Sequence, residues 1–345
     1  MRALRKTKNC LNCKTPLDDV YNYCPICGQQ NDDKNVSFRE LGKDLFENFF
    51  SFDSRLAHTF FPFFFKPGEL TKKYNEGKRF TYANPIRLYI IVSFFYFFVL
   101  NILMGDLTRE LSQALDSPEV DSVQNVFQKE MEFNLDSIKN APPVMVRFDE
   151  DSLEDSADVS WPLEEWQWKM FNQYMDDNSV SEEALFDSLQ LENRHALTQL
   201  TVKQIIRIYK RDKELLVSQI VKNLSVMMFV LIPVFALLLK LMYIRRKTLY
   251  INHLIHTIHL HTFAFFVYGL MMAIMHWMVQ SDNAQNWMAI GSLSVVFIYS
   301  FLSFKMVYGQ SWKKTFLKYW ITAWLYFYIL VFAIITELLI SLLIF

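Results

Sequence analysis

The stretch IRLYIIVSFFYFFVLNILM, residues 86–104, decides the fold class because it stays apolar over the length of a membrane crossing. A transmembrane helix needs about 20 mostly apolar residues. Four later stretches have the same character, so the sequence predicts spans at 83–104, 224–243, 262–279, 287–307 and 319–344. We therefore expect an all-α polytopic membrane protein with about five transmembrane helices.

The charges of the 345-residue chain are strongly segregated, although its formal net charge is only −1. Residues 1–104 carry a net charge of +5, residues 105–223 carry −12, and residues 224–345 carry +6. Hydrophobic residues make up 52% of the chain and gather in the predicted spans. This distribution excludes intrinsic disorder, a single soluble domain and a disulfide-rich secreted scaffold.

The acidic segment 105–223 is predicted to be a helical domain outside the cell membrane. Ser117-Pro118-Glu119 is a helix start, and a second start follows Trp161-Pro162. Apolar residues then recur at near-helical spacing. A helical bundle that packs on itself and a ligand-binding receptor domain both remain open here.

Lysine and arginine beside the spans predict the orientation of the chain in the membrane, because cytoplasmic loops carry an excess of them. Basic residues gather before the first span, after the second, and between the fourth and fifth, whereas the loop SDNAQNW at 281–287 has none. We expect a cytoplasmic N-terminus, with residues 105–223 and the C-terminus on the extracytoplasmic side. The region 224–345 then holds four spans.

Residues 38–80 form an amphipathic segment that is too short and too charged to span. The sequence predicts a helix along the cytoplasmic headgroups, interrupted at Pro62 and ended by Lys66-Pro67-Gly68. Basic side chains would contact anionic lipid at about 1 kcal/mol each. They are Lys66, Lys72, Lys73, Lys78 and Arg79.

All four cysteines lie in the first 27 residues, as Cys10-x2-Cys13 and Cys24-x2-Cys27. Two such turns can place four thiolates around one Zn²⁺, so residues 1–31 are predicted to be a closed, structural zinc ribbon with one zinc per chain. Two disulfides or a redox CxxC are the alternatives, but a reducing cytoplasm disfavours the first, and the βαβ context of the second is missing. The few lysines give a thin phosphate-binding footprint, so we expect a protein partner rather than nucleic acid.

Histidines form the second cluster of chemistry-bearing residues. At about 100° per residue, His253, His256 and His259 share an arc of roughly 120°, and His261 faces elsewhere. They could share a metal or relay protons, or they could lie on an interfacial helix or pack between helices. Glu337 is the one acidic residue inside a predicted span, which makes it a functional candidate, although it could also reach toward water at the chain end.

The order of these pieces resembles an uncharacterised bacterial family of zinc-ribbon membrane proteins, known only as a domain of unknown function. The resemblance covers most of the chain except the acidic segment and implies an integral inner-membrane protein with a cytoplasmic ribbon. It implies no activity, and His256 departs from the family pattern. The residues that carry it are Cys10-Leu-Asn-Cys13, Tyr23-Cys24-Pro-Ile-Cys27-Gly28-Gln29, Lys66-Pro67-Gly68, Gly77-Lys78-Arg79, Tyr82-Ala-Asn-Pro85-Ile-Arg87-Leu-Tyr89, Pro233…Lys240, His253…His259-Leu-His261 and Tyr308-Gly309-Gln310-Ser311.

The sequence favours a non-enzymatic membrane scaffold or regulatory protein whose ribbon docks a partner. No phosphate-binding loop, GxSxG elbow or HExxH motif is present, and 8 glycines leave little for a phosphate cradle. A transporter of small solutes or ions through the histidines and Glu337 is the alternative. A membrane enzyme would need a second metal on His253, His259 or His261. A homo-oligomer is compatible with either reading.

Overall fold

The computed structural model describes residues 6–33, 41–42, 54–115, 182–189, 199, 202–204, 206 and 213–344. The chain forms two compact units, Met1–Leu103 with Val221–Leu338, and Met104–Ile220 with Leu339–Phe345. In the second unit, α7 (Glu182–Ser188) falls in the predicted acidic domain. The helix starts predicted at Ser117 and Trp161 lie outside the described residues, as does most of 38–53.

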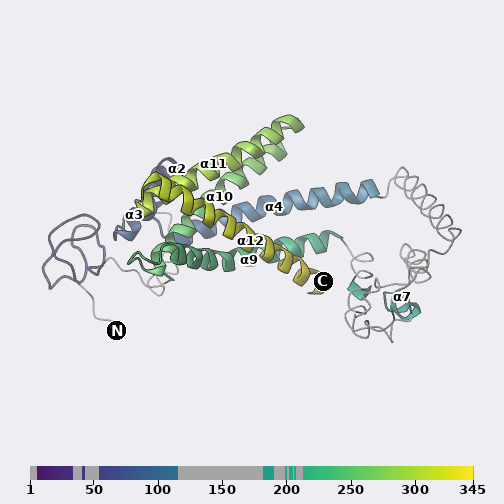
Figure 1. Cartoon of the computed structure of the whole chain (residues 1–345), viewed down its shortest axis with the longest axis horizontal. Coiled ribbons are helices and arrows are strands. Elements are labelled where there is room, and N and C mark those ends of the chain that lie inside the picture. Colours follow the sequence, from purple (N-terminus) through teal and green to yellow (C-terminus); the bar gives the residue numbers. More distant parts are fainter. Residues whose placement is uncertain are drawn as a thin grey trace, which may run out of the picture. The chain divides into compact units, whose positions relative to one another are not determined.

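Five long helices dominate the first unit (Figure 1), and each is long and apolar enough to cross a membrane. They are α4 (Pro85–Leu115), α9 (Lys213–Met242), α10 (Tyr250–Met278), α11 (Asp282–Tyr308) and α12 (Trp312–Ile344). At the start of α4, the Ile86 N–H donates to Asn84 Oδ1 at 2.9 Å, and Pro85 occupies the first helical position, where no N–H is needed. The all-helical fold class with five apolar helices is confirmed.

Helix α10 is the most buried of the five and begins at Tyr250, well before the predicted third span at residue 262. Every residue from 253 to 263 is buried, so this half of the helix is surrounded on all sides. It packs against α11 and α3, and α10 and α11 run side by side in Figure 1. The rings of Phe263 and Tyr299 stack across this interface with centroids 3.5 Å apart. Because its histidines are buried as well, α10 begins twelve residues before the apolar stretch that predicted this span.

Two short helices, α2 (Ser54–Phe65) and α3 (Glu69–Asn75), pack against each other and α3 packs against α10 and α11. Pro62 lies inside α2 rather than interrupting it. The Phe63 carbonyl would ordinarily accept from residue 67, which is a proline without an N–H. The Tyr299 hydroxyl donates to that carbonyl instead, at 2.6 Å. The end of α2 is thus joined to α11 by a bond that its own helix cannot supply.

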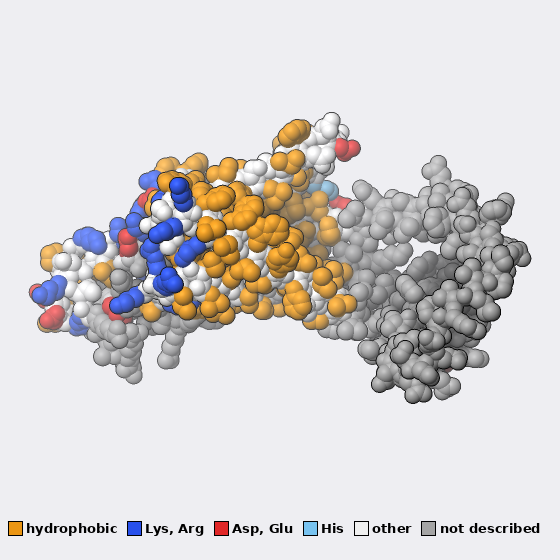
Figure 2. Space-filling model, in the orientation of Figure 1, with side chains coloured by type: hydrophobic (Ala, Val, Ile, Leu, Met, Phe, Trp, Pro, Cys, Tyr) orange, Lys and Arg blue, Asp and Glu red, His pale blue; other side chains and the backbone are white. Residues whose placement is uncertain are grey.

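Several contacts draw the basic turns of the first unit together. The Lys318 ammonium of α12 donates to the carbonyl of Met242 at the end of α9, at 2.7 Å. The phenol rings of Tyr243 and Tyr308 stack with centroids 3.6 Å apart, which joins the end of α9 to the end of α11. Figure 2 shows lysine and arginine gathered at one end of the apolar helical surface.

Candidate metal centre and buried histidines

The cysteine segment consists of two structurally equivalent knuckles, offset by 14 residues. In the first, the Cys10 N–H donates to the Thr15 carbonyl at 2.8 Å and the Lys14 N–H to the Cys10 carbonyl at 2.9 Å. In the second, Cys24 and Gly28 repeat these bonds at 2.8 and 2.9 Å, with the carbonyls of Gln29 and Cys24 as acceptors. Lys14 and Gly28 both have a positive φ, 67° and 76°. The sequence similarity is confined to the two CxxC pairs, so this repeat emerges only from the backbone bonds.

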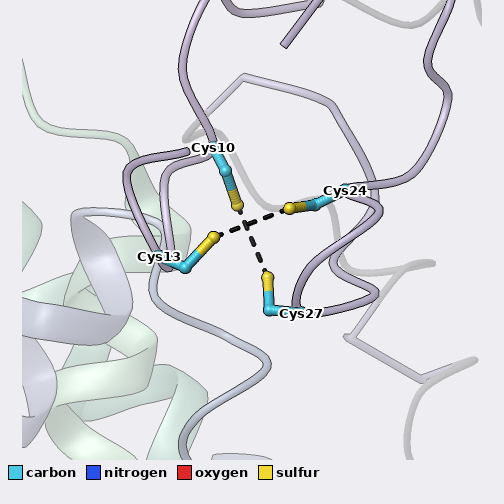
Figure 3. A group of neighbouring side chains, drawn as sticks. All are labelled: Cys10, Cys13, Cys24 and Cys27. Atoms are coloured by element: carbon cyan, nitrogen blue, oxygen red, sulfur yellow. Dashed lines mark hydrogen bonds between the residues drawn. The ribbon is translucent and has the colours of Figure 1, made fainter. Parts of the chain in front are cut away.

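The four sulfur atoms converge on one point (Figure 3) and all lie within 4.8 Å of one another. The Cys10 and Cys27 sulfurs are 3.6 Å apart, and the Cys13 and Cys24 sulfurs are 3.5 Å apart. A tetrahedron with Zn–S bonds of about 2.3 Å has edges of about 3.8 Å, whereas a disulfide requires about 2.05 Å. All four cysteines are free. The donor set therefore fits one tetrahedral metal ion held by both knuckles and does not fit two disulfides.

The surroundings of the thiols differ. Burial raises the pKa of Cys10 to about 12 and also raises the pKa of Cys27. The Thr15 hydroxyl, 3.0 Å from the Cys13 sulfur, lowers the pKa of that thiol to about 6. Because metals bind thiolates, loading the site at neutral pH must release a proton from Cys10.

The knuckles are fixed to the helical part of the first unit through the segment 77–81. The Gln29 amide donates to the Gly77 carbonyl at 2.9 Å, and its oxygen accepts from the N–H groups of Arg79 and Phe80, both at 3.2 Å. The Thr81 hydroxyl donates to Asn12 at 2.7 Å. Gly77 has a φ of 98°, and a Cβ there would lie 2.7 Å from Leu11. One face of the cysteine segment is therefore docked on residues 77–81. The docking residues Asn12 and Gln29 lie within two positions of the cysteines Cys13 and Cys27.

Four of the five histidines of α10, His253, His256, His259 and His261, are buried inside the helical packing and bond to side-chain hydroxyls. His253 Nδ1 lies 2.8 Å from the Tyr308 hydroxyl, and His256 Nδ1 lies 3.4 Å from the same oxygen. His256 Nε2 also meets the Ser303 hydroxyl at 2.9 Å. His259 Nδ1 meets the Thr71 hydroxyl at 2.8 Å, and His261 Nε2 meets Tyr326 at 2.7 Å.

The predicted arrangement around the helix explains these partners, since His253 and His256 face α11, His259 faces α3, and His261 faces α12. Among the described residues, the cysteines form the one group of three or more side chains (His, Cys, Asp and Glu) close enough to share a metal. The part of the chain that the structure describes therefore offers the histidines as bridges between helices.

Glu337 is buried near the end of α12. Tyr326, the partner of His261, lies eleven residues earlier, which is about 16 Å along the helix axis. Glu337 and the residue that bonds His261 are therefore separated along α12. A cavity of about 300 Å³ lies among α9 to α12, with His261 in an otherwise mostly apolar wall.

Sequence reasoning overlooked the most informative partners of these residues. Ser303, Tyr308 and Tyr326 sit in apolar stretches where a hydroxyl residue carries no signal of its own. Gly68, which has a φ of 79°, would place a Cβ 2.8 Å from the Ser303 carbonyl oxygen. The Lys66-Pro67-Gly68 turn thus approaches the same serine that bonds His256.

Comparison with known proteins agrees with these observations. Residues 53–97 match the family described as "Protein of unknown function (DUF3667)". The match covers α2, the Lys66-Pro67-Gly68 turn, α3, the docking segment 77–81 and the first part of α4. No curated protein matches this chain, and no solved structure matches it either. The fold and the site define a helical membrane protein with a four-cysteine cluster.

Proposed function

We propose that this protein is a membrane-anchored scaffold or regulator that presents a zinc ribbon to a soluble protein partner. One structural zinc per chain would be held by Cys10, Cys13, Cys24 and Cys27. A site of four thiolates has no open position for water, which favours a structural role over a catalytic one. The ribbon and the basic turns would lie on the cytoplasmic side of a bacterial inner membrane, with residues 105–223 and the C-terminus outside.

The observation that carries this proposal is the difference between the two sides of the ribbon. Leu11, Asn12 and Gln29 are occupied in docking to segment 77–81. Large apolar side chains elsewhere in the ribbon are exposed, led by Val20 at 85% and Ile26 at 73%, with Tyr21 and Tyr23 also exposed. Exposed aromatic and aliphatic groups on a fixed support are typical of protein-binding surfaces.

The charges of the ribbon support a protein partner over nucleic acid. Residues 1–31 carry five basic side chains, Arg2, Arg5, Lys6, Lys8 and Lys14, against Asp18 and Asp19, and this small excess gives a thin footprint for a phosphate backbone. The Lys6 ammonium also bonds the Asp19 carbonyl, which draws one lysine away from any external phosphate.

The experiment compares proteins that copurify with the full chain from its native membranes. A Val20→Ser/Ile26→Ser variant should lose a specific partner while it keeps one zinc per chain by elemental analysis. Cys24→Ser/Cys27→Ser should lose both the zinc and the same partner, and Asp18→Ala, an exposed change on the same ribbon, should keep both. Identical partner sets in all four proteins would refute the proposal.

A second candidate, proton-coupled transport, is favoured by one observation. A continuous chain of hydrogen bonds starts at the half-buried Thr248, whose Oγ1 lies 2.9 Å from His253 Nε2, and continues through buried groups to Tyr308, His256 and Ser303. Such chains can relay protons as well as join helices. Flux through proteoliposomes that falls on His256→Ala and on Glu337→Gln would establish this function, and flux unaffected by either change would discard it.

A further inference from the structure

The turns that join α9 to α10 and α11 to α12 meet through Lys318. Its ammonium donates to the Met242 carbonyl at 2.7 Å and lies 4.2 Å from the centre of the Tyr243 ring. Tyr243 in turn stacks on Tyr308, the last residue of α11. The two turns are therefore fixed relative to each other, and so are the charges that they carry.

Four cations gather where these segments meet: Arg245 and Arg246 follow α9, and Lys314 and Lys318 lie at the start of α12. The charges of Arg246, Arg245 and Lys314 all act unfavourably on the Lys318 ammonium. Both arginines and Lys314 are exposed. In the described part of the chain none of the four forms an ion pair with a carboxylate.

The region 224–345 supplies few charges that could compensate these cations. Residues 224–345 contain two acidic side chains, Asp282 and Glu337. Asp282 begins α11 at the end opposite Tyr308, and Glu337 lies nineteen residues beyond Lys318 on α12. Among the described residues, a bound anion would relieve the repulsion that Arg245, Arg246 and Lys314 exert on Lys318.

The surface beside the cations is apolar. Leu241 and Ile244 on one side, and Phe316 and Leu317 on the other, are all more than half exposed. Figure 2 shows basic side chains bordering the hydrophobic surface of the spans. The ligand that suits both features carries phosphate at one end and hydrocarbon at the other.

We propose that Arg245, Arg246, Lys314 and Lys318 bind the phosphate-bearing headgroup of an anionic phospholipid, whose acyl chains lie along the exposed faces of α9 and α12. Guanidinium groups bind phosphate oxygens through two parallel hydrogen bonds, which a lysine cannot do. Free inorganic phosphate offers the same oxygens but has no group that would cover the apolar flank. The site is separate from the ribbon and does not depend on the proposed ribbon partner.

Native mass spectrometry of the full chain in detergent tests this site, with phosphatidylglycerol, phosphatidylcholine and inorganic phosphate as probes. We expect tighter binding of phosphatidylglycerol than of phosphatidylcholine. Arg245→Gln/Arg246→Gln should weaken phosphatidylglycerol binding about 30-fold, at about fivefold per arginine, and leave phosphatidylcholine unchanged. Arg246→Gln alone provides the same comparison if the double variant does not fold.

Lys313→Gln is the matched control, because Lys313 is exposed on the same turn but is not among the charges that act on Lys318. It should bind phosphatidylglycerol like the wild type. If Lys313→Gln weakened phosphatidylglycerol binding as much as the arginine variants do, the lipid would be attracted by the diffuse charge of the surface, and the proposed site would be refuted. Equal binding of both lipids, or full displacement of phosphatidylglycerol by the same concentration of inorganic phosphate, would also overturn the lipid assignment.

Discussion

Gly68→Ala adds one methyl group, but it should destabilise the helical core by more than a change of that size usually does. Gly68 has a φ of 79°, and an added Cβ would meet the Ser303 carbonyl oxygen at 2.8 Å and its Cα at 3.0 Å. A left-handed conformation costs a non-glycine residue about 1–2 kcal/mol, and forced overpacking costs about 1–3 kcal/mol. Because the clash is with backbone of α11, no side chain can turn aside to relieve it.

The two contributions together predict a loss of about 2–5 kcal/mol. At about 2 °C per kcal/mol for a chain of this size, the melting temperature in detergent should fall by about 4–10 °C. Tryptophan fluorescence on heating measures this transition. Gly68→Asn tests the two causes separately, because asparagine tolerates a positive φ but still carries a Cβ.

Gly291→Ala is the control for this experiment. Gly291 lies in α11 with nothing within 4 Å of an added Cβ, so alanine should be neutral or stabilise the helix by about 0.5–1 kcal/mol. Gly68→Ala that melts at the wild-type temperature would refute the close approach of the Lys66-Pro67-Gly68 turn to α11. A loss in Gly68→Ala that Gly68→Asn fully restores would show that φ alone matters and the contact with Ser303 does not.

Three further predictions concern the docking segment, the histidine chain and a surface ion pair. Gln29→Ala should raise amide hydrogen exchange at Phe80 about fivefold or more, since that N–H loses the Gln29 oxygen, whereas the Arg79 N–H keeps the Gly77 carbonyl at 3.1 Å. Gln30→Ala should leave exchange at Phe80 unchanged, and equal protection in both variants would refute the docking contact. Tyr308→Phe should lower stability by about 1–3 kcal/mol in a thermal melt, because the ring nitrogens of His253 and His256 that face this hydroxyl lose their partner. The exposed Tyr328→Phe should have little effect, and similar melting temperatures for the two variants would contradict the role of the Tyr308 hydroxyl. The Lys73 ammonium lowers the pKa of Glu69, so this pair contributes stability above the ordinary glutamate pKa of 4.5 and loses it as the pH falls below that value. In thermal melts between pH 3 and 7, the acid-dependent loss of stability should be about 0.3–0.5 kcal/mol smaller in Glu69→Gln than in the wild type. The exposed Glu76→Gln is the control, and a pH profile of Glu69→Gln equal to that of Glu76→Gln would count against the ion pair.

The apolar stretches were sufficient to predict the five long helices, because length and hydropathy are properties of the local sequence. The start of α10 was the exception. His253, His256 and His259 look like an interfacial segment when read along the chain, but neighbouring helices supply a hydroxyl to each imidazole. Burial with a satisfied hydrogen bond depends on residues far away in the sequence, so periodicity could not reveal it.

The spacing of the two CxxC pairs was by itself sufficient to predict that four thiols would gather at one point, since each pair is typical of a tight turn that presents two thiols to a metal. The sequence also determined where charge and apolar surface would lie. Only the tertiary structure decided what these parts touch. Gln29 and Asn12 dock the ribbon on segment 77–81, and Gly68 allows the close approach of α11. The cations Arg245 and Arg246, which follow α9, come together with Lys314 and Lys318 at the start of α12. Contacts of this kind join positions up to 236 residues apart, as between Phe63 and Tyr299, and arise only when helices pack.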